Sequence, residues 1–285
     1  MRSIVHLSDL HFGCVNQRAV APLINAVARV NPDLVAVSGD LTQRARPHQF
    51  KEARAFLDRL SVPQIVVPGN HDVPLHNVAA RFLHPLRNYR RYITDDLQPF
   101  YADEEMAVLG VNTARSLTIK EGRINDEQIA WMSERLCGSD PRAVKVVVTH
   151  HPFDLPDGHD RRDLVGRARP AMEALARCGA DLFLAGHLHV SHTSPSAARY
   201  EIAGHSALVV QAGTAASARG RGEDNSFNVL RIERPEIVVE RFEWQPESGE
   251  FGLVTREQFL HTPDGWIRRE SMKHQGNRAP GSTPR

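Results

Sequence analysis

Apolar segments alternate with amphipathic segments along the first part of the chain. Runs of consecutive apolar residues predict short buried strands over residues 4–7, 34–38 and 64–67. Between these strands, apolar residues at helical spacing predict helices over residues 17–30 and 48–60, and an Asn-Pro pair ends the first helix. The strand-helix-strand order predicts parallel strands joined by right-handed crossovers, and therefore an α/β fold.

The same kinds of element continue as far as residue 185. Three more buried strands are predicted, at residues 106–111, 144–149 and 181–185. Two more helices are predicted, over residues 125–136, capped by Asn125 or Asp126, and over residues 168–178, ended by Gly179. The intervening stretch from residue 75 to residue 94 is rich in arginine and is expected to be helical but irregular.

The chain changes character after about residue 195. Segments rich in β-forming residues follow one another at 207–211, 226–232 and 237–244, with turn residues between them. We expect antiparallel strands that complete a second sheet. Residues 1–269 are thus predicted to form a single domain. Residues 270–285 have almost no apolar content, which predicts a disordered tail.

The 285 residues have the composition of an ordinary globular protein, with 41% hydrophobic and 24% charged residues. This composition excludes a wholly disordered chain, a collagen-like repeat and a coiled-coil rod. The net charge of +1 offers no bulk electrostatic attraction to nucleic acid or to an anionic membrane.

The cytoplasm is the predicted location. The three cysteines, Cys14, Cys137 and Cys178, are sparse, odd in number and without a CxxC spacing. This usage predicts a reducing compartment and no disulfide framework. The N-terminus lacks the apolar core and cleavage site of a signal peptide. No run approaches the ~18 apolar residues of a membrane span.

Five polar clusters each come shortly after a predicted strand. They are Asp9-Leu10-His11, Gly39-Asp40, Gly69-Asn70-His71-Asp72, His150-His151-Pro152 and Gly186-His187-Leu188-His189. The loops beyond the carboxyl ends of parallel strands are where α/β sheets bind ligands, so these clusters are expected to converge. Asp-x-His or Gly-Asp alone is most often a turn or a helix cap, whereas Gly-Asn-His-Asp and Gly-His-x-His are more specific to a site. Together, their carboxylate, imidazole and carboxamide groups predict a site for Mn, Fe, Zn or Ni rather than a thiolate site.

The series D-x-H, G-D, G-N-H-D, H-H-P and G-H-x-H resembles the calcineurin-like metallophosphoesterase superfamily over residues 4–190. The overall layout is most similar to bacterial class III cyclic-nucleotide phosphodiesterases. The resemblance implies a four-layer αββα sandwich of two mixed sheets flanked by helices, with a dinuclear metal centre. By motif, the ligands would be Asp9, His11, Asp40 and His189 for one ion, and the bridging Asp40 with Asn70, His150 and His187 for the other.

The resemblance also implies roles for the groups around the metals. The two ions would be divalent or trivalent Mn, Fe, Zn or a mixed pair, and a hydroxide bridging them would attack the phosphorus in line. His71 would not ligate but would stabilise or protonate the leaving oxygen. Asp72 would either orient His71 or cap the following turn, and the sequence leaves both roles open. His151 adjoins a ligand, and a structural role is favoured for it.

A small phosphodiester, cyclic or otherwise nucleotide-based, is the expected substrate. The segments Gly-Asp-Leu-Thr-Gln-Arg-Ala and Gly-Asn-His-Asp differ from the Gly-Asp-x-Val-Asp-Arg-Gly and Gly-Asn-His-Glu typical of protein phosphatases in this superfamily. Asn70 and His71 are expected to contact the substrate. Arg219 and Arg221 lie in a glycine-containing loop that is suited to holding a phosphate, although a plain surface turn is the alternative there.

Other functions stay open. A repair-type DNA exonuclease would need a basic groove, and the candidates are the four arginines from Arg81 to Arg91, with Tyr89 and Tyr92 for base stacking. A solvated helix face explains that stretch more simply. A pyrophosphohydrolase of nucleotides or nucleotide-linked lipids is another enzyme class. A non-catalytic scaffold is opposed by the complete set of ligands, and a homodimer is neither predicted nor excluded.

Overall fold

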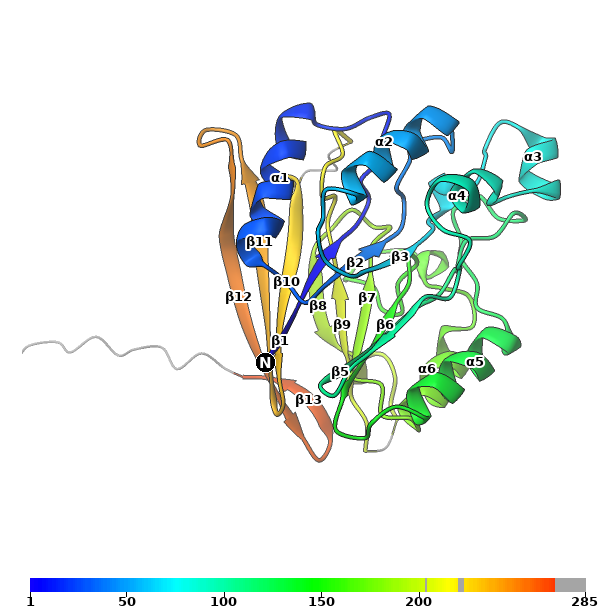
Figure 1. Cartoon of the computed structure of the whole chain (residues 1–285). Helices are drawn as coiled ribbons and strands as arrows, with labels where there is room; N and C mark the ends of the chain where they lie inside the picture. Colours follow the sequence, from blue (N-terminus) through cyan, green and yellow to red (C-terminus); the bar gives the residue numbers. More distant parts are fainter. Residues whose placement is uncertain (203, 220–222, 270–285) are drawn as a thin grey trace, which may run out of the picture.

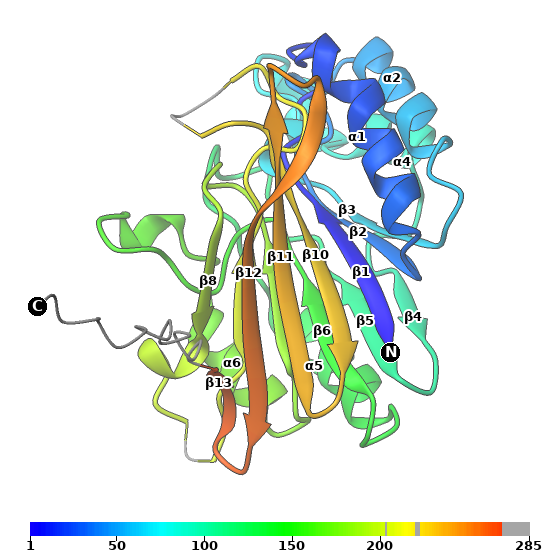
Figure 2. The same ribbon diagram turned by 90° about the vertical axis from the view of Figure 1, so that its left-hand side faces the viewer.

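The computed structural model describes residues 1–202, 204–219 and 223–269, and the predicted tail at 270–285 lies outside the described residues. Two sheets pack face to face (Figures 1 and 2). The first sheet has the strand order β13 (Gly265–Arg268), β12 (Glu250–Thr262), β11 (Glu236–Gln245), β10 (Ser226–Glu233), β1 (Arg2–Leu7), β2 (Leu34–Ser38) and β3 (Gln64–Val67). The second has the order β4 (Phe100–Ala102), β5 (Met106–Gly110), β6 (Val144–Val148), β7 (Leu182–Ala185), β9 (Leu208–Gln211) and β8 (His192–Pro195).

Helices flank both sheets. They are α1 (Gln17–Val30), α2 (Pro47–Leu57), α3 (Val78–Leu83), α4 (Arg87–Tyr92), α5 (Asp126–Cys137) and α6 (Ala168–Ala176), with short 3-10 turns at Asn70–Asp72, Arg161–Asp163 and Ser196–Ala198. Asn125 caps α5, because its side chain accepts a hydrogen bond from the Gln128 amide. None of the helices in the described part of the chain has both the length and the hydrophobicity needed to span a bilayer.

Alternating side chains of the strands create three apolar layers. Val5 of β1 packs in the same cluster as Leu23 of α1 on the outer face of the first sheet. Ile4, its neighbour in sequence, faces the opposite way and belongs to the layer between the two sheets. Met132 of α5 and Leu175 of α6 cover the outer face of the second sheet. The predicted four-layer αββα sandwich is therefore confirmed (Figure 1).

The strands β1, β2 and β3 are parallel, as the alternation with helices predicts. The later strands β10 to β13 are antiparallel, as predicted, but the prediction of their sheet was wrong, because they extend the first sheet instead of completing the second. The crossover through α1 places β2 at one edge of β1, and β10 pairs with the edge that remains. The predicted strand at 207–211 is β9, which is parallel to β7 in the second sheet.

The arginine-rich stretch forms two short helices, α3 and α4, at one corner of the molecule (Figure 1). Arg81 is buried, and its guanidinium donates to the carbonyl oxygens of Pro74, Ser116 and Thr118. Tyr89 is also buried, and its hydroxyl lies 2.9 Å from the Val66 carbonyl oxygen. These two side chains serve the fold, so Tyr89 does not have the exposure needed for stacking on a base.

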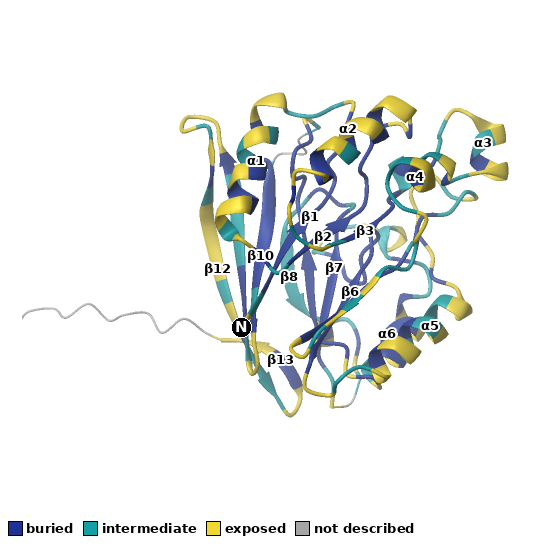
Figure 3. Ribbon diagram, in the orientation of Figure 1, coloured by how far each residue is buried: buried dark blue, intermediate teal, exposed yellow. Residues whose placement is uncertain are grey.

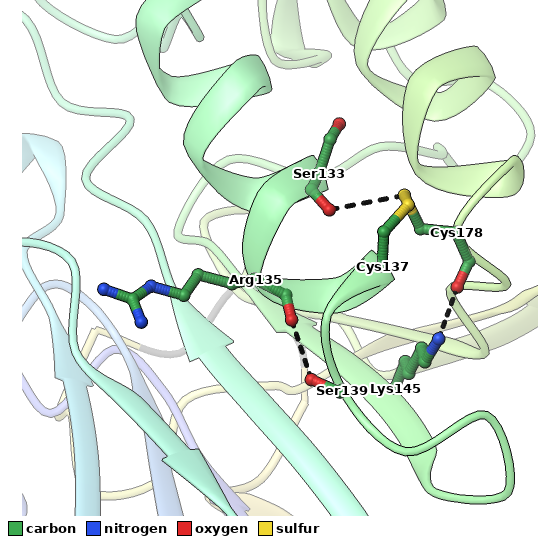
Figure 4. The surroundings of a disulfide bond; sticks show 6 residues. All are labelled: Ser133, Arg135, Cys137, Ser139, Lys145 and Cys178. Atoms are coloured by element: carbon green, nitrogen blue, oxygen red, sulfur yellow. Dashed lines mark hydrogen bonds between the residues drawn. A yellow bond between two sulfur atoms is a disulfide. The ribbon is translucent and has the colours of Figure 1, made fainter.

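Cys137 and Cys178 form a disulfide, which corrects the expectation of no disulfide (Figure 4). Cys137 is the last residue of α5, and Cys178 lies two residues beyond the end of α6. The two helices pack side by side on the second sheet, so their ends bring the two Cα atoms within 4.6 Å. Cysteine count and spacing do not reveal this helix pairing. Cys14 is free.

Replacing both disulfide cysteines with serine is expected to lower the free energy of unfolding by up to about 4 kcal/mol, because the bond closes a loop of 41 residues. Urea denaturation without reductant measures the change, and Cys14→Ser is the matched control with no expected effect. Equal midpoints for the double variant and the unaltered protein would contradict the disulfide.

A second prediction concerns His6 of β1, which is fully buried. Its Nε2 lies 2.9 Å from the Ser38 hydroxyl, and burial lowers its pKa from 6.5 to about 3. Between these two values the unfolded chain binds a proton that the folded chain excludes, so the free energy of unfolding falls as the pH drops below 6.5.

His6→Gln removes this contribution of His6 to the pH dependence of the free energy of unfolding. Over a fall of about 1.5 pH units below the ordinary pKa, the variant is expected to lose about 2 kcal/mol less stability than the unaltered protein. Urea denaturation at the two pH values gives the difference. His48→Gln on the exposed side of α2 is the control, and a parallel loss in all three proteins would refute the role of His6.

Candidate metal centre

The five polar clusters come together at the carboxyl ends of β1, β2, β3, β6 and β7. In the first group of side chains, His189 Nε2 lies 3.1 Å from Asp9 Oδ1 and 3.2 Å from His11 Nε2. His11 Nε2 is also 3.5 Å from Asp9 Oδ1 and 3.8 Å from Asp40 Oδ2. All four residues are buried.

A second group lies on the other side of Asp40. Asn70 Oδ1 is 3.1 Å from His150 Nε2 and 3.1 Å from His187 Nδ1. His150 Nε2 is in turn 3.4 Å from Asp40 Oδ1. Asp40 therefore directs one carboxylate oxygen to each group, which is the placement a bridging ligand needs.

The electrostatics keep Asp9, Asp40 and His187 in the form that binds cations. Burial opposes the ionisation of Asp9, yet the neighbouring His189 and His11 hold the pKa of this carboxyl well below its ordinary value. Burial likewise opposes ionisation of Asp40, and His150 lowers the pKa of that carboxyl. Burial and the nearby His150 lower the pKa of His187 to about 3, so its imidazole is neutral at physiological pH.

A buried oxygen without a hydrogen bond indicates what the site is built to hold. His189 Nε2 lies 3.1 Å from the buried Asp9 Oδ1, yet within the described residues no donor makes a hydrogen bond of acceptable geometry to this oxygen. Such a carboxylate oxygen is costly in a folded protein unless it has a partner. With imidazole nitrogens and a carboxamide oxygen around it, a cation of the Mn, Fe or Zn type fits this set of donors.

The backbone is strained where the candidate ligands lie. Eight described residues other than glycine have a positive φ, and five of them are candidate ligands, namely Asp9, His11, Asp40, His187 and His189, with φ between 51° and 73°. Left-handed backbone costs about 1 to 3 kcal/mol for such residues and persists only where the surrounding structure imposes it. Its concentration in one place indicates a functional site.

Two glycines allow the loops to pack closely against the ligands. A Cβ on Gly69 would collide with the backbone nitrogen and the carboxylate of Asp40. A Cβ on Gly186 would collide with the Ser8 hydroxyl and the Asp9 carboxylate. The glycines of the G-N-H-D and G-H-x-H clusters are therefore needed for the approach of one loop to another.

Residues that the sequence analysis missed orient the ligands. Ser8 Oγ donates to Asp9 Oδ2 over 2.6 Å. His150 Nδ1 lies 2.8 Å from the Ser38 carbonyl oxygen, which can only accept, so Nδ1 carries the hydrogen and Nε2 is free to coordinate. Neither serine stands out in the sequence, because a serine beside a strand end is common.

His151 contacts the centre from outside. Its Nε2 lies 2.7 Å from the Lys120 carbonyl oxygen, and its Nδ1 lies 2.7 Å from the Thr113 hydroxyl. Both ring nitrogens are therefore engaged although the ring packs against His150 and His187. This geometry supports the structural role favoured from the sequence.

His71 lies beside the centre and is partly open to solvent, with 23% of its side chain exposed. Its Nδ1 is 3.0 Å from the Gln43 carbonyl oxygen, and its Nε2 is 4.0 Å from Asp40 Oδ2. Arg219 Nη1 donates to the Gln43 side chain over 3.4 Å, which brings its charge near His71 and His11. Arg221 lies outside the described residues.

Within the described residues, the Asp72 carboxylate bonds neither the His71 ring nor the turn that follows Asp72, but residues that precede it. Its carboxylate accepts hydrogen bonds from the amides of Leu41, Thr42 and Gly69 and from the Thr42 hydroxyl. These bonds hold the loop that carries Asp40. Burial and repulsion from Asp40 raise the pKa of Asp72 to about 6.

The family comparison agrees with this geometry. The model of the calcineurin-like phosphoesterases matches residues 2–191, which include all five clusters. The chain belongs to this family. Its curated relatives include a probable cyclic nucleotide phosphodiesterase of a Synechococcus species, 26% identical over 66% of this chain and 73% of that protein. The glycerophosphodiester phosphodiesterase GpdQ of Enterobacter lignolyticus is 33% identical, but the match covers 56% of this chain and only 60% of that protein.

Solved structures of phosphatases share the fold. A dimetal phosphatase from Danio rerio superposes with a TM-score of 0.63 and 14% identity, covering 92% of this chain and 99% of that one. Purple acid phosphatase PPD1 from yellow lupin gives a TM-score of 0.66 at 12% identity, covering 90% of this chain and 53% of that one. At such identities the likeness concerns the fold alone.

Gly69→Ala should displace Asp40 and weaken binding of Mn²⁺ about 10- to 100-fold, as expected when the support of a ligand is disturbed. Calorimetric titration of the metal-free protein measures this affinity. Gly158→Ala is the control, since this glycine also has a positive φ but open space around it. Unchanged affinity in a folded Gly69→Ala protein would be evidence against a metal at Asp40.

Proposed function

We propose that this chain hydrolyses phosphodiester bonds in small molecules, with a cyclic nucleotide as the first candidate substrate. The observation that carries the proposal is the pair of donor groups sharing Asp40, with one carboxylate oxygen directed to each. Asp9, His11, Asp40 and His189 would hold one cation, and Asp40, Asn70, His150 and His187 the other. Bound there, two cations would supply positive charge for an in-line displacement at phosphorus.

The side chains beside the donors have separate tasks in this proposal. The Gln43 carbonyl accepts from His71 Nδ1, so the remaining ring nitrogen, Nε2, faces the centre and can hold a proton. Protonated at Nε2, His71 would donate that proton to the leaving oxygen. Asn70 and Arg219 would hold the phosphate, and Asp72 would position Asp40 through the backbone.

The names of the relatives support a diester rather than a monoester. Those from Synechococcus and Moraxella catarrhalis are named probable cyclic nucleotide phosphodiesterases, and two others are named glycerophosphodiester phosphodiesterases. Both classes of substrate contain one phosphorus bonded to two ester oxygens. A glycerophosphodiester is therefore the second candidate substrate, favoured by the 33% identity to the Enterobacter enzyme.

The protein loaded with Mn²⁺ is expected to cleave bis(p-nitrophenyl) phosphate faster than p-nitrophenyl phosphate. Asp40→Asn should abolish both activities, because it removes the shared carboxylate, whereas Asp58→Asn, at the exposed residue just beyond the end of α2, should change neither. His71→Gln should lower kcat about 10²- to 10⁴-fold without loss of bound metal.

Faster cleavage of the monoester would overturn the proposal in favour of a phosphatase. Absence of both activities in protein with bound metal would favour the non-catalytic scaffold. If the diester is preferred, comparing kcat/KM for 3′,5′-cyclic AMP and for glycerophosphocholine decides between the two candidate substrates.

A further inference from the structure

Five exposed hydrophobic side chains gather at one corner of the molecule. Val78, Phe82 and Leu83 of α3 are 63%, 53% and 71% exposed, and Leu117 and Ile119 of the loop between β5 and α5 are 86% and 59% exposed. They make up half of the ten large hydrophobic residues that are exposed among the described residues. We call these five residues the apolar tip. Figure 3 shows the exposed surface of α3 at the outer corner.

The two segments of the apolar tip form one surface because Arg81 joins them. Arg81 belongs to α3, and its guanidinium donates over 2.7 Å to the Ser116 carbonyl oxygen and also to that of Thr118. A third bond, to the Pro74 carbonyl oxygen, ties the start of the segment to the same group. A buried arginine thus joins the two segments that carry the exposed apolar side chains.

Arginines border the apolar tip. A cavity of about 680 Å³ opens beside Leu83 and is lined by Arg87, Arg90, Arg91 and Arg115. Asp95 is the only acidic residue lining it, and its backbone carbonyl accepts from Arg90. No ion pair with a described residue neutralises these four guanidinium groups, whereas Arg54 of α2, the helix that packs against α4, is paired with Asp58. The surface complements an anionic partner.

We propose that the apolar tip and its bordering arginines dock this protein on an anionic lipid surface. Apolar side chains at the end of a short helix and a loop enter the boundary between headgroups and acyl chains, while arginines remain at the level of lipid phosphates. A second copy of this chain fits less well. A symmetric contact between two such tips would bring the arginines of both copies together.

The tip is connected to the candidate metal centre. The loop that carries Leu117 and Ile119 runs between Thr113 and Lys120, and both of these residues hydrogen-bond the His151 ring. His151 packs against His150 and His187. Docking through the tip would therefore hold the centre close to the lipid surface. The proposal concerns binding alone and does not depend on the proposed hydrolysis.

Flotation of the full chain with vesicles tests the docking surface. Binding is expected to vesicles of phosphatidylglycerol and phosphatidylcholine in equal parts, to be weaker with phosphatidylcholine alone, and to fall as salt is raised. Phe82→Glu and Leu117→Glu should each weaken binding at least about tenfold. Leu253→Glu is the matched control, because Leu253 is 50% exposed on β12, away from the tip. This variant should bind the vesicles as the unaltered protein does.

Absence of flotation with the anionic vesicles would overturn the proposal, as would an equal loss in the Leu253→Glu control. Light scattering of the same proteins measures their oligomeric state and so tests whether a second copy of the chain occupies the tip. A dimer that Leu117→Glu dissociates would assign the tip to a second copy instead. Circular dichroism verifies that the variants fold. Leu117 is the more exposed of the two test positions, so if Phe82→Glu fails to fold, the result for Leu117→Glu is decisive.

Discussion

The carboxylate of Asp40 joins the two halves of the candidate site. Its two oxygens lie 3.4 Å from His150 Nε2 and 3.8 Å from His11 Nε2, so a shift of this one side chain disturbs both donor groups. Because the carboxylate is buried, losing either set of partners would leave an uncompensated charge. The loop is accordingly held from outside, where Asp72 accepts from the Leu41 and Thr42 amides.

The sandwich provides the rigidity that this arrangement requires. Five left-handed residues at one site store strain of several kcal/mol in total, which only well-packed surroundings can sustain. The strands that carry them, β1, β2 and β7, are buried throughout or nearly so, with apolar layers on both faces. Side chains at the carboxyl ends of such strands have little freedom to move, and this favours a preorganised site.

His151 links the buried centre to the exposed corner of the molecule. Its ring is hydrogen-bonded to both ends of the loop that carries part of the apolar tip. Chemistry and localisation would thus be divided between two regions, with the reaction at the strand ends and docking at α3 and its neighbouring loop. The connection between them runs through Thr113, which follows the end of β5 by three residues.

The strands near the centre and the donors that follow them could be predicted from local residue patterns alone. The bounds predicted for β2 and β3 agree with the structure, since a continuous apolar run marks a strand buried on both faces. The five clusters are recognisable because each combines unusual residue types at a fixed place after a strand. The pairing of β10 with β1, the bond between Cys137 and Cys178, and the contact of His71 with Gln43 rather than Asp72 depend on long-range packing. Local patterns record periodicity and burial, but these contacts depend on which surfaces meet when distant segments pack.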